Sequence, residues 1–496
     1  MRRYYFGIIS LLWLFSSGLA FATGYQQVQT LSPTIPGSPF LQDNFGANMH
    51  YNPDSKELFV GAVVGRAAGV VASGVVYVYR KSGQDWTLAQ TITTEGLSDH
   101  FGAFSIKTIG NWLFIPCIGT PAGPYPGEDI TNQDFTGSIR IYHKDVSGQY
   151  VFVQALDRTT PGLENLTVID PAVLTPPSPP PTKDFEQGAA FGLSFDLDEE
   201  GDNLLVGAAT QQNTDGTGSP LINSGAVYAF KREHNKWVLK QTIQDPEGPV
   251  INGSFGGVVK ISGHLAAIST STVFVNMRFD VNSKVFLYEY NDELEKWEHV
   301  DTVHGDQTNL LPLFAPTLGG NIMLGDNFGA SLAFWNKWLI VGAPFEHMGS
   351  GQIKGAAYLY RVKHAGAKKE LELEKKIVSD DANALMTGFN VALQGKTALV
   401  SDLTHTGPFG QTAQGGILVY KRHGNNWYKD ITLFDENGGA FDLFSNGVEV
   451  HHNLIFGGTG STVPVLFLAF FFDPPFLFPP LPLQENKVVI WKRTGH

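Results

Sequence analysis

A phenylalanine followed by small residues recurs along the chain and constrains the fold more than any other feature. The segment FGASLAFWNKWLIVGAP, residues 328–344, is typical of two short strands around a tight turn, because apolar residues alternate on both sides of a polar pair. Related starts occur at Phe45, Phe101, Phe191, Phe255, Phe328, Phe389 and Phe444. Recurrence over such distances indicates a repeat array with insertions of variable length.

Four strand patterns follow the first six starts in the same order, and three of them follow the last start. After the alternating segment at the phenylalanine comes a β-rich run such as LFVGA at residue 58. The third pattern alternates aromatic residues, as in GVVYVYRK at residue 74, and the fourth begins with an aromatic residue, as in WTLAQTI at residue 86. Four strands per unit predict a propeller blade, so the chain is expected to be an all-β, seven-bladed β-propeller with four antiparallel strands per blade.

The last unit lacks a fourth strand, because the chain ends at His496 soon after Trp491. The missing pattern stands at the other end, where Tyr25–Leu31 reads YQQVQTL and matches the fourth strands of other units. We therefore expect the N-terminal strand to complete the last blade and to protect open sheet edges. Residues 23–496 would then form a single propeller domain, with loop insertions at 157–188 and 459–485.

Composition supports this fold class and limits the partners. The chain has 55 glycines and 28 prolines, with 12% aromatic and only 16% charged residues, which favours β-structure and turns over helices. The formal net charge of −13 disfavours nucleic acid as a partner. Cys117 is the only cysteine, so no intrachain disulfide can form, and its place in an apolar strand pattern predicts that it is buried.

The first 22 residues are typical of a cleaved secretory signal peptide. Arg2 and Arg3 precede an apolar run, and Ala20-Phe21-Ala22 has the small-residue pattern of a cleavage site. The apolar run is shorter than the roughly 20 residues that a membrane-spanning helix needs. We expect a secreted, periplasmic or cell-surface protein.

The Phe-Gly starts and the Gly-Ala-Pro ending of the unit at 328–344 resemble FG-GAP repeats, the units of the integrin α-chain-like seven-bladed β-propeller. The resemblance covers nearly the whole mature chain and implies that fold, but its functions range over adhesion, carbohydrate binding and uncharacterised exported proteins. Many members carry a calcium loop of the D-x-D-x-D-G type. The nearest match here is Asp196, Asp198 and Asp202, which leaves open a single weak Ca²⁺ site or an ordinary solvated turn; no other cofactor is expected.

Long connections are predicted to gather on one face of the ring, which favours that face for binding. The segment 463–483 is unusual, because it is strongly apolar and yet contains six prolines and Asp473, which exclude a membrane-spanning helix. Three interpretations stay open for it. It folds back over the ring, forms a hydrophobic patch for a partner, or inserts shallowly into a membrane, and the acidic charge disfavours the last.

Catalytic motifs are absent from the sequence: there is no H-E-x-x-H, G-x-S-x-G or phosphate-binding glycine loop. Among the first-strand segments expected near the axis, a search for paired carboxylates finds only Asp196 and Glu449, and the histidines that follow Glu449 are interpreted as a solvated strand end. We therefore do not expect an enzyme. The tryptophans that open the fourth strands are expected to pack between blades; they are Trp86, Trp237, Trp297 and Trp427.

The sequence thus favours an exported, adhesion-like binding module that recognises a protein or glycan on a cell surface or envelope through its long loops. The predicted ligand-binding residues are Tyr125, Asp129, Phe345, His347, His405, Phe409, Phe470, Phe471, Phe476 and Phe478. Two alternatives stay open. One is a lectin-like propeller with sugars in the clefts between blades, and the other is a hydrolase with its site at the propeller axis.

Overall fold

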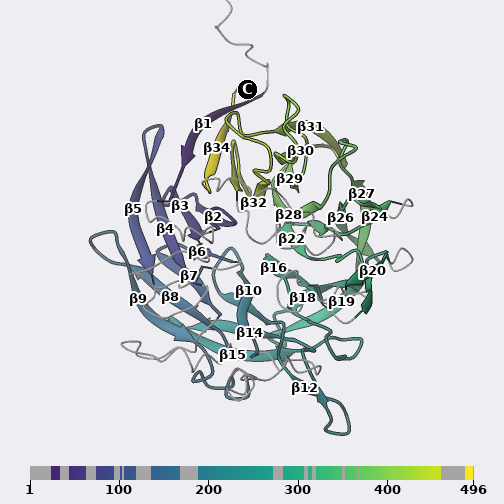
Figure 1. The fold of residues 1–496 in the computed structure, drawn as a ribbon. Helices are drawn as coiled ribbons and strands as arrows, with labels where there is room; N and C mark the ends of the chain where they lie inside the picture. The colour runs from purple at the N-terminus through teal and green to yellow at the C-terminus, as the bar shows by residue number, and fades with distance from the viewer. Residues whose placement is uncertain are drawn as a thin grey trace, which may run out of the picture.

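The computed structural model describes residues 24–33, 44–62, 74–93, 101–102, 105–118, 136–167, 188–271, 283–306, 311–315, 320–348, 352–366, 368–459 and 486–494. Seven four-stranded antiparallel sheets follow one another around a central axis (Figure 1). The fold predicted from the sequence, an all-β propeller of seven blades, is confirmed.

Each blade runs from an inner first strand to an outer fourth strand. Blade 1 contains β2 (Asn48–Asn52), β3 (Glu57–Ala62), β4 (Val75–Ser82) and β5 (Asp85–Thr93). Blade 2 contains β6 (Lys107–Ile109), β7 (Trp112–Cys117), β8 (Ser138–Lys144) and β9 (Tyr150–Leu156), and blade 3 contains β10 (Phe191–Leu197), β11 (Asn203–Ala208), β14 (Ala226–Glu233) and β15 (Lys236–Ile243). Blade 4 contains β16 (Val259–Ser262), β17 (Leu265–Ser269), β18 (Lys284–Asn291) and β19 (Lys296–His304).

The remaining blades continue the same order. Blade 5 contains β22 (Ser331–Trp335), β23 (Trp338–Ala343), β26 (Ala356–Ala365) and β27 (Lys368–Ile377), and blade 6 contains β28 (Thr387–Gln394), β29 (Thr397–Asp402), β30 (Gly416–His423) and β31 (Asn426–Leu433). Blade 7 contains β32 (Phe444–His451), β33 (Leu454–Thr459) and β34 (Val488–Arg493), and its outer strand is β1 (Tyr25–Leu31).

The ring is closed by the pairing of the two ends of the chain. β1 runs antiparallel to β34, with Tyr25 opposite Arg493 and Leu31 opposite Val488. Tyr25 and Leu31 are both buried against the neighbouring strands. The prediction that an N-terminal strand completes the last blade is confirmed, and the last blade has the same four strands as the other six.

The repeated phenylalanines are the most buried residues of the units. Six of the seven starting phenylalanines have no exposed surface, and Phe389 is 3% exposed. The following glycine is needed for a close approach: Gly46 has a φ of 92°, and a Cβ there would lie 2.8 Å from Cγ2 of Val488. The glycine of the Phe-Gly pair therefore allows the backbone at the start of a blade to pack closely against the preceding blade.

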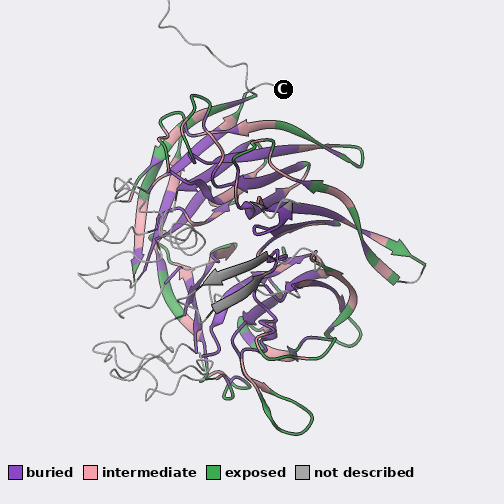
Figure 2. Ribbon diagram, turned by 45° about the vertical axis from the view of Figure 1, so that its right-hand side comes forward, coloured by how far each residue is buried: buried purple, intermediate pink, exposed green. Residues whose placement is uncertain are grey.

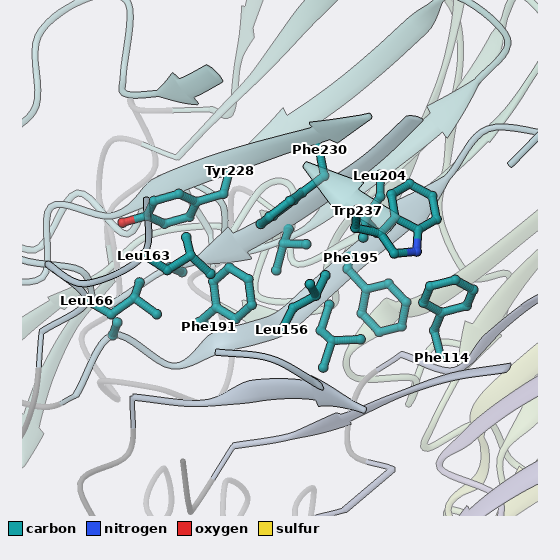
Figure 3. Packing of buried hydrophobic residues seen from close by; sticks show 14 of the residues in the cluster. Phe114, Leu156, Leu163, Leu166, Phe191, Phe195, Leu204, Tyr228, Phe230 and Trp237 are labelled. Atoms are coloured by element: carbon teal, nitrogen blue, oxygen red, sulfur yellow. The ribbon is translucent and has the colours of Figure 1, made fainter. Parts of the chain in front are cut away.

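Packing between blades follows one rule. The tryptophan that opens a fourth strand contacts the second strand of the preceding blade: Trp86 lies 5.7 Å from Phe456, and Trp237 lies 5.8 Å from Phe114. Trp427 repeats this contact with Trp338 at 5.4 Å. Figure 3 shows Trp237 against Phe114, with Phe191 and Phe195 of β10 in the same cluster. The predicted packing role of these tryptophans is confirmed.

Burial is highest on the second strands, such as β3, β23 and β33, whose residues are all buried, and lowest at the outer hairpins (Figure 2). Cys117 is buried in β7 as predicted. Three connections between blade strands contain a short hairpin of their own. In these hairpins β12 (Asn213–Thr214) pairs with β13 (Pro220–Leu221), β20 (Leu311–Ala315) with β21 (Gly320–Leu324), and β24 (His347–Met348) with β25 (Gln352–Ile353). Within the described ranges, no helix is long and apolar enough to cross a bilayer.

Candidate functional site

The first strands of all blades surround the axis (Figure 1). Each of them contributes one residue to a common layer. The pairing register shows this layer, because each member lies opposite the equivalent residue of its second strand; for example, Lys107 pairs with Phe114 and Glu449 with Phe456. The seven members of the layer, in blade order, are His50, Lys107, Asp196, Lys260, Ala333, Ala392 and Glu449. Ionisable side chains therefore occupy five consecutive blades, and alanines fill the other two.

Side chains of this layer reach toward the first strand of the next blade. Nζ of Lys107 lies 2.9 Å from Oδ1 of Asp196. In turn, Oδ2 of Asp196 accepts a hydrogen bond from the backbone N–H of Ile261 at 3.1 Å. Asp196 therefore connects blade 2 to blade 4 and is only 4% exposed itself.

The strand that carries Lys260 is held on both sides of that residue. The N–H of Val259 donates to Oγ of Ser194 at 2.9 Å, and the N–H of Ile261 donates to Asp196. These are inner-edge backbone donors, which are costly to bury unpaired. The two β10 side chains thus satisfy the edge of β16 and fix the position of Lys260.

The ionisable groups of the layer have displaced pKa values. Burial, reinforced by the nearby charge of Lys107, lowers the pKa of Lys260 to about 8. Burial likewise raises the pKa of Glu449 to about 7, although Lys107 and Lys260 oppose that rise. Burial alone would lower the pKa of Lys107, but Asp196 and Glu449 outweigh it and the pKa is raised. The pKa values of Lys260 and Glu449 thus lie close to neutrality, as is typical of acid–base sites.

His50 belongs to the same layer but is uncharged at neutral pH. Burial and then the charges of Lys107 and Lys260 hold the pKa of His50 well below its usual 6.5. Its Nε2 lies 3.0 Å from Oγ1 of Thr108, the neighbour of Lys107. A neutral imidazole at this place is a hydrogen-bonding group rather than a cation.

A cavity of about 220 Å³ lies on the axis above this layer, on the side where the first strands begin. Lys260 and Glu449 both line it, together with polar side chains two residues earlier in the strands, among them Asn48, Ser331 and Asn390. The cavity is smaller than the roughly 300–1,000 Å³ of pockets for drug-sized ligands. It fits a small molecule that meets a carboxyl group and an amine at the bottom.

This arrangement can perform acid–base chemistry. A carboxyl group with a pKa near neutrality is present in part as a base at neutral pH, and it can take a proton from water. An ammonium group in the same low-dielectric cavity can stabilise negative charge that develops on a carbonyl oxygen. The described residues include no group of three His, Cys, Asp or Glu side chains placed to hold a metal ion.

Of the ligand-binding residues predicted from the sequence, the structure describes Phe345, His347, His405 and Phe409. Phe345 and His347 are 1% and 6% exposed, and His405 contacts Phe434 at 5.1 Å and lies 3.7 Å from Asp381. Phe409 is 78% exposed. Outside the described residues lie Tyr125, Asp129, Phe470, Phe471, Phe476 and Phe478, and so do residues 1–22, the segment 463–483 and most of the insertions at 157–188 and 459–485.

The three aspartates of the possible calcium loop serve different partners. Asp196 pairs with Lys107 at the axis, whereas Asp198 accepts the N–H groups of Asp202 and Asn203 within its own turn. Asp202 is exposed and lies 3.3 Å from Nη2 of Arg232. The carboxylate of Asp196 thus forms an ion pair with another blade, that of Asp198 stabilises a turn, and that of Asp202 makes a surface contact.

Sequence reasoning missed the lysines of the axial layer because it searched the first strands only for paired carboxylates. Lys107 and Lys260 stand in those segments, AFSIK and GVVKI, but at different distances from the starting phenylalanine. The register shows Lys107, Asp196, Lys260 and Glu449 in one layer.

Comparison with known proteins gives structural neighbours only. Neither protein families nor curated proteins match this chain. A "putative 6-phosphogluconolactonase" from Bacteroides fragilis has 10% identity and a TM-score of 0.46, covering 80% of this chain and 86% of its own. A protein of the same name from Bacteroides uniformis has 10% identity and a TM-score of 0.44, covering 79% and 86%, and a protein from Lactobacillus plantarum has 10% identity and a TM-score of 0.44, covering 80% and 86%.

These neighbours correct the function expected from the sequence. The prediction of an adhesion-like binding module is wrong against this comparison: two of the three structures carry the name putative 6-phosphogluconolactonase, and none is named for adhesion. No family model supports the integrin-like FG-GAP resemblance, and what the structure does establish is the seven-bladed propeller.

Proposed function

We propose that this protein is a hydrolase whose active site is the axial cavity. The observation that carries the proposal is the layer of His50, Lys107, Asp196, Lys260 and Glu449, in which a carboxyl group and an amine that titrate near neutrality line the same cavity. Sequence reasoning kept a hydrolase at the axis as an alternative. The charged layer, rather than any likeness in name, is the reason to prefer it.

In the proposed reaction, Glu449 is the general base and Lys260 stabilises the transition state. The carboxylate of Glu449 takes a proton from a water molecule, whose oxygen attacks the carbonyl carbon of an ester or lactone. The ammonium group of Lys260 stabilises the negative charge that develops on the carbonyl oxygen. The bond to the alkoxide leaving group then breaks, and the leaving oxygen takes up the proton that Glu449 acquired.

The Lys107–Asp196 pair has a positioning role in this scheme. Asp196 binds the backbone beside Lys260, and Lys107 neutralises Asp196, so that its negative charge does not attract the ammonium group of Lys260 away from the substrate. The small size of the cavity favours a small ester or lactone over a polymer. The sequence also predicts FG-GAP-type units and an export signal, and both predictions are compatible with this activity.

The test is hydrolysis of a panel of small lactones and activated esters, which is measured through the protons that the reaction releases. Glu449→Gln is expected to lower kcat/KM by about 10²–10⁴-fold, the usual contribution of a general base. Lys260→Met is expected to lower kcat about 10²-fold or more, because a charge-stabilising donor is lost. Matched controls are Glu436→Gln and Lys236→Met, whose side chains are exposed and distant from the axis.

The pH profile gives an independent readout. Activity is expected to rise as Glu449 loses its proton near pH 7 and to fall as Lys260 loses its proton near pH 8, which gives a narrow bell. In Lys260→Met the falling limb should disappear while the rising limb stays. Full activity in Glu449→Gln, or no hydrolysis of any substrate in the panel by the wild-type protein, would refute the proposed function.

A further inference from the structure

A second hollow lies at the opposite end of the blades from the connections that carry β12–β13 and β24–β25. It has a volume of about 720 Å³ and is lined by the turns between first and second strands in blades 4, 5 and 6. The end of β30 in blade 6 completes the wall. None of its lining residues belongs to the axial layer, so this hollow is separate from the proposed active site.

The lining is cationic although the protein as a whole is acidic. Lys337, Lys396 and Arg422 line the hollow, and no Asp or Glu is among its lining residues. Within the described part of the chain, none of these three cations has a carboxylate within ion-pair distance. The acidic groups at the rim contact other lining residues: Oε1 of Glu199 accepts a hydrogen bond from the hydroxyl of Ser262 at 3.2 Å, and Oδ2 of Asp292 lies 3.3 Å from Nδ1 of His264. In a chain of net charge −13, three uncompensated cations at one concavity favour an anionic ligand.

Arg422 is held rigidly at this place. Its guanidinium lies over two indole rings, 5.0 Å from the centroid of Trp338 and 5.8 Å from that of Trp427. Its Nη1 donates to the carbonyl oxygen of Gly424 at 2.8 Å. Among the described residues, its buried Nε has no hydrogen-bond partner. Stacking on the two indole rings thus fixes a planar cation in the wall of the hollow, so that ordering it costs a ligand little.

An aromatic surface accompanies the cations. Trp335 lines the hollow and is only partly buried, whereas Trp338 below it is 2% exposed. The polar groups of Ser262 and Asn336 lie in the same wall. A flat apolar ring beside fixed charges and hydroxyl or amide groups suits a ligand that has an apolar ring face, hydroxyl groups and a negative charge.

We propose that this hollow binds an acidic oligosaccharide, with Trp335 against one sugar ring and Lys337, Lys396 and Arg422 around its carboxylates. A nucleic acid strand would also offer rings and negative charge. Three cations on a protein of net charge −13 are few for a phosphate backbone, which binds through many such contacts. The sugar carboxylate is therefore the ligand that the observations favour.

The experiment measures binding by calorimetry and by tryptophan fluorescence, with trigalacturonate as the acidic probe and maltotriose as its neutral counterpart. Wild-type protein is expected to bind trigalacturonate and not maltotriose, and the affinity should fall as salt is added. Lys337→Met/Lys396→Met is expected to weaken binding about tenfold or more, since two charged contacts are lost. Trp335→Ala should weaken it by a similar factor, and Trp335→Phe by less, because a smaller ring remains.

The matched control is Lys236→Met/Lys296→Met, which removes the same charge from two exposed lysines of hairpins at the same end of the blades. It should bind trigalacturonate like the wild type. The proposal is overturned if the two double variants bind equally, if maltotriose binds as well as trigalacturonate, or if oligothymidylate binds more tightly than either sugar. It is overturned as well if none of these probes binds. Glu449→Gln is expected to bind trigalacturonate normally, so failure at the axis and failure at this hollow are distinguishable.

Discussion

At the scale of single residues, Glu57 at the junction of blades 1 and 2 is a buried carboxylate with several charged and polar partners. Its side chain has no exposed surface and lies 2.8 Å from Nη2 of Arg80 and 2.7 Å from Nζ of Lys144. The hydroxyl of Tyr150 also donates to it at 2.9 Å. Burial would raise the pKa of Glu57, but the hydrogen bonds from Lys144 and Arg80 outweigh burial and the pKa lies below 4.5.

We predict that Glu57→Gln destabilises the protein by about 3 kcal/mol at neutral pH, because a lysine and an arginine lose their buried partner. The half-exposed Arg80 keeps this value at the low end of the range. A depressed pKa in the folded state means that this stabilisation is present above pH 4.5 and is lost as the pH falls through the folded-state pKa. The variant should therefore lose less stability in acid than the wild type. Denaturant titrations at neutral and acidic pH measure both effects.

The control for this variant is Glu436→Gln, which changes an exposed carboxyl group with no ion pair to a described residue. It should leave both the stability and its acid dependence unchanged. Equal acid sensitivity in Glu57→Gln and in the wild type would contradict the assignment of this buried charge.

At the scale of elements, the blades themselves could be predicted from the sequence. Alternating residues with aromatic starts specify strands directly, because a strand exposes its two faces alternately. The repeat of the same four patterns also revealed that YQQVQTL belongs to the last blade, some 460 residues away along the chain, by likeness to other fourth strands. The short hairpins β12–β13, β20–β21 and β24–β25 carry no repeat signal and were not anticipated.

We predict that deletion of the chain up to Leu31 lowers the free energy of unfolding by about 5 kcal/mol or more, since the buried side chains of Tyr25 and Leu31 are lost together. It also exposes the edge of β34, which favours association of chains through that edge. Thermal denaturation and size-exclusion chromatography measure the two consequences. The control is a deletion that ends before Tyr25, which should be as stable as the full chain. A monomer of unchanged stability after removal of Leu31 would contradict closure through β1.

At the scale of the whole molecule, a closed ring makes each blade depend on both neighbours. Phe45 in blade 1 and Phe328 in blade 5 are both fully buried, and other blades separate blades 1 and 5 on either side of the ring. A ring has no free end at which unfolding can stop, unlike an open repeat array. Loss of one blade therefore removes the packing of two others.

We expect Phe45→Ala to cost about 3–5 kcal/mol and to speed amide hydrogen exchange of the slowest sites in every blade, including blade 5. Phe328→Ala should give the same pattern from the other side of the ring. Hydrogen exchange followed by mass spectrometry of blade peptides measures it. Faster exchange confined to blades 7, 1 and 2 in Phe45→Ala would show that the blades unfold independently.

The sequence by itself determined the number of blades, their strands and the closure of the ring, because these depend on local alternation and on a repeated unit. Only the tertiary structure decided the candidate sites. Lys107, Asp196, Lys260 and Glu449 come from four blades, and no local pattern announces that their side chains share a layer. The same holds for Lys337, Lys396 and Arg422 in the second hollow. The physical reason is that strand pairing sets the register of each inner strand, and burial at the axis then displaces pKa values that are ordinary in the isolated chain.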